Sequence, residues 1–147
     1  MNEKKDMLRL ENQLCFPLYA CSKEIIRRYK PYLDPLDLTY TQYITMMVLW
    51  EKKTLTIKEL GKILYLDSGT LTPVLKKLET KGYITRQRSK EDERSVSVTL
   101  TVDGQKLKEA ATEIPVKLGD CLKLMPSEIF QLHSLLHQLL SGLGLDN

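Results

Sequence analysis

Three cysteines, Cys15, Cys21 and Cys121, are the residues of this chain best suited to covalent chemistry. A cysteine reacts as its thiolate, which is a nucleophile toward an oxidant such as a peroxide, so a reactive cysteine needs groups that stabilise negative charge. Tyrosine hydroxyls can donate hydrogen bonds to a thiolate, and Tyr19 follows Cys15 by one helical turn. The chain has seven tyrosines against two phenylalanines, which is unusual for a plain core. The alternative is that Cys15 is a small buried hydrophobe.

The length and composition are those of a single domain with one core, because the chain has 147 residues. Its formal charge of +3 is only mildly basic, and neither requires nor excludes nucleic acid. The N-terminus lacks an apolar signal segment, and no apolar run is long enough to span a membrane. We therefore expect a cytoplasmic protein without membrane contact, in which three cysteines do not form a structural disulfide framework.

Residues 67–101 have the pattern of a helix followed by a β-hairpin. Apolar residues recur at helical spacing in the first half, at Leu71, Val74, Leu75 and Leu78. Gly82 stands where a helix commonly ends. Two runs rich in β-branched residues follow, at 83–88 and 95–101, joined by the charged turn 89–94. This order predicts a recognition helix with a β-hairpin wing, and hence a DNA-binding protein.

Two capping boxes predict the helices that come before this segment. Thr39 with Gln42 opens a helix through Trp50, and Thr56 with Glu59 opens a short one. The short helix and the helix after Asp67 form a predicted helix-turn-helix. Pro73 lies inside the second of these helices, and we expect it to distort the first turns or to shape the helix start.

The segments DSGTLTPVLKKLE (67–79) and EDERSV (91–96) resemble the MarR family of bacterial repressors, in particular its organic hydroperoxide resistance regulators. The resemblance extends from Gln13 to the last helix. It implies a mainly α fold with a small β-hairpin wing (α+β), that is, a winged helix-turn-helix with N- and C-terminal dimerisation helices. Residues 1–147 would be a single MarR-type domain, with the DNA-binding core at 39–101 and the dimerisation helices at 1–38 and 102–147.

The candidate DNA-binding residues lie on the polar helix face and on the wing. Short hydroxyls and cations that could reach bases and phosphates occupy the face opposite the apolar stripe: Ser68, Thr70, Thr72, Lys76 and Lys77. The resemblance implies that Asp92 braces Arg94, that Arg94 enters the minor groove, and that Arg86 and Arg88 lie near phosphates. A guanidinium in a narrow minor groove detects shape more than sequence. The alternative is a solvated charge cluster on an ordinary hairpin.

The resemblance also gives the cysteines a role. It implies that Cys15 is the peroxide-reactive residue and that Tyr29 and Tyr40 of the partner subunit hydrogen-bond its thiolate, with Tyr19 close by. Oxidation to the sulfenic acid would weaken these bonds, and the palindromic operator would be released. Cys121 lies near the position of the resolving cysteine in two-cysteine members; the alternative is a chance thiol. Cys21 falls on another helical face and receives no role.

The helices outside the core suggest a homodimer. We expect a long helix over Leu8–Tyr29, with Pro17 kinking it or marking its regular start, and a connector over 30–38. Thr101 is expected to cap a helix interrupted near Pro115, and a last amphipathic helix begins near 126. Their apolar faces exceed what a small winged core needs, so they would pair about a two-fold axis that matches a palindromic operator. Alternatively, they fold back within one subunit.

Other functions have weaker support in the sequence. His133 and His137 are four residues apart but lack a clear third metal ligand, so we expect no metal and no cofactor. The chain has no phosphate-binding glycine loop and no hydrolase motif, so we do not expect an enzyme. Two alternatives stay open: a MarR-type repressor released by a phenolic or other small ligand, and a thiol redox enzyme using Cys15 and Cys121.

Overall fold

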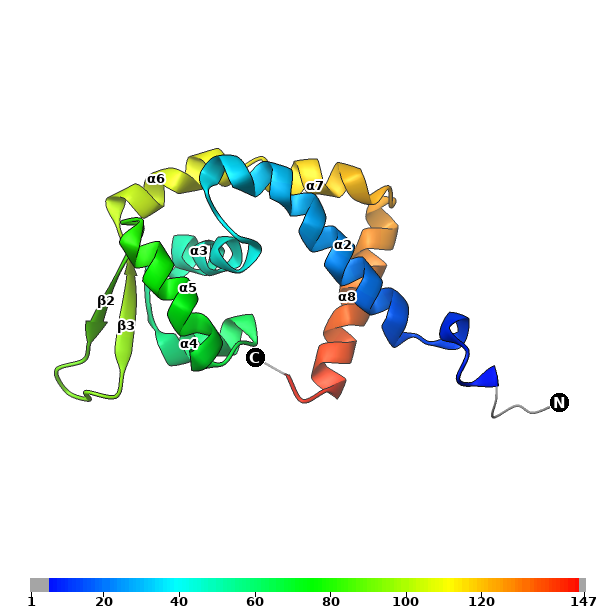
Figure 1. Ribbon diagram of the computed structural model, residues 1–147, viewed down its shortest axis with the longest axis horizontal. Coiled ribbons are helices and arrows are strands. Elements are labelled where there is room, and N and C mark those ends of the chain that lie inside the picture. Colours follow the sequence, from blue (N-terminus) through cyan, green and yellow to red (C-terminus); the bar gives the residue numbers. More distant parts are fainter. Residues whose placement is uncertain (1–5, 146–147) are drawn as a thin grey trace.

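The computed structural model describes residues 6–145 of the chain. Figure 1 shows a winged helical part and an arm that projects from it, formed by α2 and α8. The elements are η1 (Leu10–Asn12), α2 (Cys15–Leu33), η2 (Asp34–Leu36), α3 (Tyr40–Lys52), β1 (Thr54–Thr56), α4 (Ile57–Leu64), α5 (Ser68–Thr80), β2 (Ile84–Arg88), β3 (Val96–Leu100), α6 (Val102–Ala111), α7 (Ile114–Leu122) and α8 (Pro126–Gly142). The predicted mainly α fold with a winged helix-turn-helix is confirmed.

The wing belongs to a three-stranded antiparallel sheet in the order β1–β3–β2. Strands β2 and β3 form the predicted hairpin, in which Ile84 lies opposite Leu100. Strand β1 pairs with the other edge of β3, where Leu55 lies opposite Val98. Strand β1 was not predicted from the sequence, because three residues are too few to display an alternating pattern.

The core of the winged part lies against the apolar stripe of α5. Leu71, Leu75 and Leu78 have no exposed surface, whereas Val74 at the edge of the stripe is only partly buried. They belong to one cluster with residues of α3, α4 and the sheet, including Met46, Leu49, Leu60, Ile84 and Val98. Burying a leucine side chain contributes about 1.5–3 kcal/mol. The stripe therefore fixes the orientation of α5 and leaves its polar face at the surface.

Two predicted capping boxes determine where α3 and α4 begin. Thr39 Oγ1 accepts a hydrogen bond from the backbone N–H of Gln42, and Gln42 Oε1 accepts one from the backbone N–H of Thr39 at 3.0 Å. Thr56 and Glu59 make the same reciprocal pair at the start of α4. Both predictions are confirmed, because such caps depend only on residues three apart in the chain.

Gly82 ends α5, as predicted. Its φ of +81° lies in the left-handed region that favours glycine. The N–H of Gly82 donates to the Glu79 carbonyl and the N–H of Tyr83 donates to the Leu78 carbonyl, which is the Schellman pattern of hydrogen bonds. Pro73 does not interrupt α5, which is continuous from Ser68 to Thr80.

Helix α2 begins later and ends later than the sequence suggested. The prediction of a helix that starts at Leu8 was wrong. Helix α2 starts at Cys15, and among the described residues before it only the short η1 is an element of its own. Pro17 is the third residue of α2, where a backbone N–H has no partner within the helix, so its missing N–H does not interrupt the helix there. The predicted connector over 30–38 is too long, because α2 runs through Pro31 to Leu33.

The helix predicted to follow Thr101 is two helices, α6 and α7, separated at 112–113 near Pro115, as expected. Thr101 Oγ1 accepts from the Gly104 N–H at 3.1 Å and donates to the Gly82 carbonyl. Trp50 Nε1 donates to the Gly104 carbonyl at 2.8 Å. The start of α6 is thus joined to both the end of α5 and the core helix α3.

We predict that Thr101→Ala lowers the free energy of unfolding by about 1–2 kcal/mol, because it removes the cap of α6. Urea denaturation followed by circular dichroism measures the change. Thr112→Ala is the control, since the exposed Thr112 hydroxyl only donates to the Lys108 carbonyl of its own helix. Equal effects of the two substitutions would contradict the proposed importance of the cap.

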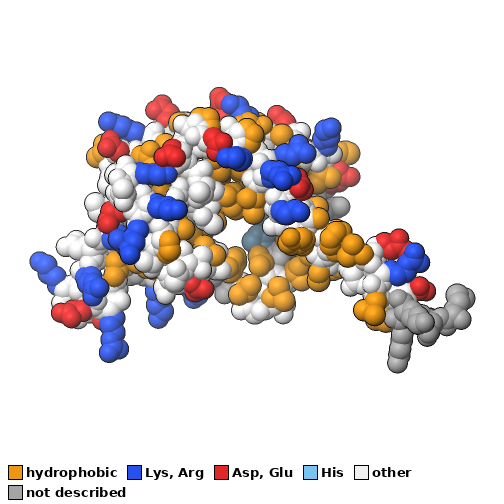
Figure 2. Space-filling view, viewed as in Figure 1, with side chains coloured by type: hydrophobic (Ala, Val, Ile, Leu, Met, Phe, Trp, Pro, Cys, Tyr) orange, Lys and Arg blue, Asp and Glu red, His pale blue; other side chains and the backbone are white. Residues whose placement is uncertain are grey.

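The arm exposes large apolar side chains. Helix α8 has no buried residue, and Phe130 and Leu135 are 72% and 62% exposed. Helix α2 buries only Leu33, while Phe16 and Tyr19 near its start are exposed. Figure 2 shows apolar side chains gathered on the arm, beside the hollow that separates it from the winged part. Among the described helices, none has the length and apolar character needed to cross a membrane.

Candidate functional site

The polar face of α5 lies at the surface, as the burial of the opposite stripe requires. Ser68, Thr70, Lys76 and Lys77 are exposed, and Thr72 is half-buried. The Thr72 hydroxyl donates to the Ser68 carbonyl at 2.7 Å, so its side chain lies along the helix. All five predicted residues of this face therefore lie on one helix, with the lysines in its second half.

Asp67 caps the start of this helix. Its Oδ1 accepts from the backbone N–H of Thr70 at 2.7 Å, and this hydrogen bond lowers the pKa of the Asp67 carboxyl below its ordinary value. The carboxylate also interacts favourably with the positive end of the helix dipole. This cap was not predicted from the sequence, although Asp before a helical run is a recognised capping signal.

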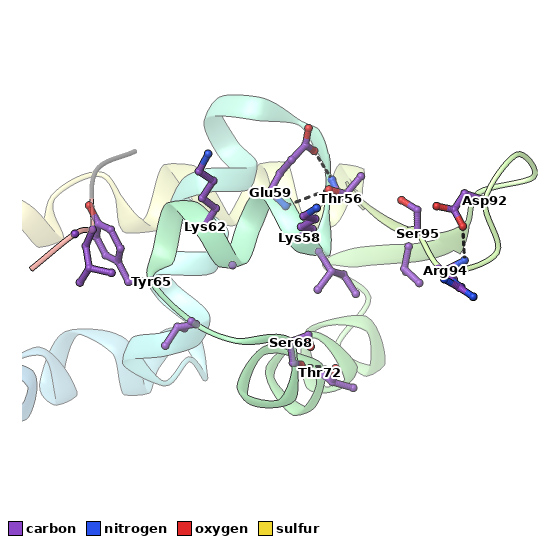
Figure 3. Close-up of a pocket in the computed structure, with 16 residues that line it drawn as sticks. Thr56, Lys58, Glu59, Lys62, Tyr65, Ser68, Thr72, Asp92, Arg94 and Ser95 are labelled. Atoms are coloured by element: carbon purple, nitrogen blue, oxygen red, sulfur yellow. Dashed lines mark hydrogen bonds between the residues drawn. The ribbon is translucent and has the colours of Figure 1, made fainter. Parts of the chain in front are cut away.

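The tip of the wing holds Asp92 and Arg94 at the surface. Asp92 Oδ1 accepts from the backbone N–H of Arg94 at 3.0 Å (Figure 3). The hydroxyl oxygen of Ser89 accepts from the backbone N–H groups of Glu91 and Asp92. Asp92 thus orders the turn that carries Arg94. In residues 6–145 its carboxylate makes no ion pair with the Arg94 guanidinium, which points away from the wing.

A cleft of about 1270 Å³ separates the wing from α4 and α5. Figure 3 shows Ser68 and Thr72 on one side of it and Asp92 and Arg94 on another. Lys58 and Lys62 of α4 also line it. The fold therefore brings the first turns of α5 and the wing tip to one surface, although twenty or more positions separate them in the chain.

Arg86 and Arg88 occupy different environments. The Arg86 guanidinium pairs with Glu79 Oε1 at 3.1 Å, and its backbone N–H donates to Glu79 Oε2 at 3.0 Å. This interaction lowers the pKa of the Glu79 carboxyl. The Arg86 side chain is only 22% exposed, and its buried Nε has no hydrogen-bond partner among residues 6–145. Arg86 therefore joins the wing to α5, whereas Arg88 is exposed at the end of β2.

Tyr29, Tyr40 and Tyr43 form an aromatic cluster where α2 meets α3. The Tyr29 ring centroid is 4.9 Å from that of Tyr40 and 5.7 Å from that of Tyr43. Burial, and then the neighbouring tyrosines, raises the pKa of Tyr29 to about 12. Burial also raises the pKa of Tyr40. At neutral pH both hydroxyls are therefore protonated and can donate a hydrogen bond.

Cys15 is exposed at the first residue of α2, and Tyr19 lies one turn further, with Lys23 Nζ 5.6 Å from its ring centroid. The structure does not bring Cys15 to the tyrosine cluster within one chain. Tyr29 is fourteen residues along the same helix, which corresponds to about 21 Å at 1.5 Å per residue. A thiolate at Cys15 could therefore meet Tyr29 and Tyr40 only through a second copy of the chain.

Cys121 is exposed at the end of α7 and lies beside a tyrosine that sequence reasoning did not identify. The Tyr32 hydroxyl is 3.6 Å from Cys121 Sγ, and this thiol also donates to the Lys117 carbonyl at 3.4 Å. The hydrogen bond with Cys121 raises the pKa of Tyr32. No local pattern could have paired Tyr32 with Cys121, because 89 residues separate them. Cys21 is also exposed.

The histidine pair on α8 is the strongest metal-ligand pattern of the sequence. His133 Nε2 and His137 Nε2 are 3.1 Å apart on the exposed face of the helix. Within residues 6–145, no group of three or more histidine, cysteine, aspartate or glutamate side chains is placed to hold a metal ion.

Comparison with known proteins identifies relatives along nearly the whole chain. A family model described as transcriptional regulator SarA/Rot matches residues 27–111. The organic hydroperoxide resistance transcriptional regulator of Bacillus subtilis (strain 168) is 52% identical over 145 residues, covering 94% of this chain and 99% of that protein. Reduced AbfR bound to DNA is 37% identical, with a TM-score of 0.80 over 97% of this chain and 99% of that one. A disulfide-formed AbfR, 36% identical, has a TM-score of 0.66 over 95% and 98% of the two chains.

Proposed function

We propose that the protein is a redox-controlled transcriptional repressor. The chain belongs to the MarR family of winged-helix transcriptional regulators, in the branch of the organic hydroperoxide resistance regulators. The reduced protein binds a palindromic operator in double-stranded DNA and acts in the cytoplasm. Oxidation of Cys15 by an organic hydroperoxide releases the operator. The chain acts as a regulator and not as an enzyme.

The shared surface of α5 and the wing tip is the observation that carries the DNA-binding part of this proposal. A helix whose exposed face has short hydroxyls and lysines fits the major groove. Lys76, Lys77 and Arg88 would contact phosphates, and Arg94 would enter the adjacent minor groove from the turn that Asp92 orders. Ser68, Thr70 and Thr72 are the candidates for base edges. Arg86 contributes indirectly, by holding the wing against Glu79 of α5.

The exposed apolar faces of α2 and α8 support a homodimer. A second copy would cover side chains such as Phe130 and Leu135, which are unfavourable in water. A two-fold axis places two copies of α5 on successive half-sites of a palindrome. The same pairing is what would bring Tyr29 and Tyr40 of one copy to Cys15 of the other.

The sensing reaction is the oxidation of a thiolate. Cys15 as thiolate attacks the terminal oxygen of the hydroperoxide, the O–O bond breaks, and the organic alkoxide leaves and takes up a proton as the alcohol. The product is a sulfenic acid. The protonated hydroxyls of Tyr29 and Tyr40 stabilise the thiolate by donating hydrogen bonds to it. These hydrogen bonds become much weaker when oxidation makes the sulfur neutral. The reduced dimer arrangement is thereby destabilised.

Cys121 is the candidate for a second step, in which its thiolate attacks the sulfenic sulfur of the partner's Cys15 and expels hydroxide. We predict that Cys121→Ser abolishes a reducible intersubunit crosslink after hydroperoxide treatment, which non-reducing gel electrophoresis measures. Tyr32→Phe is the control, because it removes the neighbouring hydroxyl and keeps the thiol. A crosslink that persists in Cys121→Ser would implicate Cys21 or a Cys15 pair instead.

A gel shift on a family-type palindromic duplex tests the whole proposal, with reduced protein before and after stoichiometric cumene hydroperoxide. We expect tight binding that peroxide abolishes and that dithiothreitol restores. Binding that peroxide leaves unchanged would contradict peroxide sensing and favour release by a phenolic or other small ligand. Absence of specific binding, together with turnover of peroxide at the expense of a thiol, would instead favour a thiol redox enzyme.

A further inference from the structure

We propose that Lys81 is a positioning residue that fastens the C-terminal end of α5 to the turn between α2 and α3, and so couples the arm to the helix that binds DNA. The inference rests on the proposed function, since it concerns how a change at the arm reaches α5. The contacts of Lys81 with Asp37 and Gln42 form what we call the Lys81 bridge.

The Lys81 bridge joins residues more than thirty-five positions apart in the chain. Lys81 is the C-cap residue of α5, and its Nζ lies 3.3 Å from Asp37 Oδ2. The same Nζ donates to the Asp37 backbone carbonyl and lies 3.4 Å from Gln42 Oε1. The lysine side chain is only 24% exposed. An ammonium on a largely covered side chain, with three oxygen acceptors around it, is held in one place, unlike an ordinary surface lysine.

The other side of the bridge is the turn that connects the arm to the core. Asp37 adopts a left-handed conformation with φ +52° and ends η2, directly after α2. Gln42 is 3% exposed, and its Oε1 also accepts from the Thr39 N–H in the capping box of α3. Lys81 therefore contacts both Asp37, whose left-handed backbone conformation is uncommon, and Gln42, whose side chain fixes the start of α3.

This turn lies between the candidate sensing residues and α5. Helix α2 runs from Cys15 to the turn, and Tyr40, the first residue of α3, packs on Tyr29 of α2. A displacement of α2 reaches the turn through a continuous helix. Apolar packing between α3 and α5 permits sliding, whereas a directional ion pair with hydrogen bonds at the helix end does not. With the bridge in place, movement of the turn carries α5 with it.

Lys81→Met is the informative substitution, because it should leave the fold intact. Methionine keeps most of the aliphatic stem and removes the ammonium. The Asp37 side chain is 88% exposed, so its oxygens can be hydrated, and Gln42 Oε1 keeps its bond from the Thr39 N–H. Neither side-chain acceptor of the bridge is therefore left buried without a partner. Lys81 is also absent from the residues proposed to contact DNA.

The test measures operator affinity by fluorescence anisotropy for reduced protein and for protein treated with cumene hydroperoxide. We expect reduced Lys81→Met to bind the operator with a Kd within about threefold of the wild-type value. The ratio of the Kd of oxidised protein to that of reduced protein should be at least about fivefold smaller than in the wild type. Lys81→Arg, which keeps the charge, should restore part of the ratio. Lys106→Met, an exposed lysine of α6, should leave both quantities unchanged. Mass spectrometry of Cys15 verifies equal oxidation in all variants.

A full peroxide response in Lys81→Met would overturn the coupling role of Lys81. Hydrogen exchange of the reduced proteins separates this failure from failure of the proposed function. The bridge predicts faster exchange of the backbone around 34–40 in Lys81→Met than in Lys106→Met, whether or not peroxide releases DNA. Unchanged exchange there would also overturn the inference. A wild-type protein that ignores peroxide, with altered exchange in Lys81→Met, would contradict only the proposed peroxide sensing.

Discussion

Cys15→Ser is expected to bind the operator as tightly as the wild type and to remain bound after hydroperoxide treatment. Serine preserves the size of the side chain at the start of α2, where Cys15 is exposed, so the fold should not change. Its hydroxyl does not form the nucleophilic anion that attacks a peroxide near neutral pH. Because allosteric couplings commonly change affinity by about 5- to 150-fold, the wild type should lose affinity in that range while the variant loses none.

The measurement is operator affinity by anisotropy over a titration with cumene hydroperoxide. Cys21→Ser is the matched control, because Cys21 is an exposed cysteine on the same helix without a proposed role. It should respond as the wild type does. A Cys15→Ser protein that still releases DNA would place sensing at another residue. Loss of the response in Cys21→Ser would do the same.

Arg94→Ala is expected to weaken operator binding by about 1–3 kcal/mol, or roughly 5- to 150-fold in Kd. Arg94 is exposed at the wing tip, beyond the turn that the Asp92–Arg94 hydrogen bond orders, so alanine removes the guanidinium without removing a core contact. That hydrogen bond uses the backbone N–H and is retained in the variant. The proposed dimer and the thermal midpoint of the protein should therefore be unchanged.

Lys90→Ala is the control for charge, because it removes one cation from the same exposed turn. If Arg94 enters a narrow minor groove, its loss should cost much more than the loss of Lys90. If both residues only add to the electrostatic field, both variants should show the same small loss and the same change in salt dependence. Equal effects would thus remove Arg94 from the proposed contacts.

The sequence was sufficient for features that depend on residues close together in the chain. The capping boxes at Thr39 and Thr56, the glycine that ends α5 and the hairpin after it all depend on local spacing, and each is confirmed. The start of α2 was misjudged because an apolar pattern continues upstream of Cys15, although only the short η1 forms there. A pattern of apolar residues does not show where packing partners end.

Features that depend on long-range contacts could not be predicted. The Tyr32–Cys121 hydrogen bond and the Lys81 bridge connect residues brought together only by the packing of α2, α3, α5 and α7. The structure also shows that Asp92 accepts from the backbone of Arg94 and that Arg86 pairs with Glu79. Residue type and spacing predicted that Arg86, Asp92 and Arg94 lie on the wing, but not which atoms they contact, and they did not identify Glu79 as a partner.

Helix α8 has no buried residue within one chain, so in the proposed homodimer its packing depends on the concentration of the chain in the cell. A helix that gains its apolar contacts from another copy is stabilised by mass action, so its stability rises with chain concentration. At concentrations below the dimer dissociation constant, the number of competent repressors would vary with the square of the chain concentration. Halving the supply of the chain would then leave about a quarter of the dimers, and derepression could follow from dilution during growth without any oxidant.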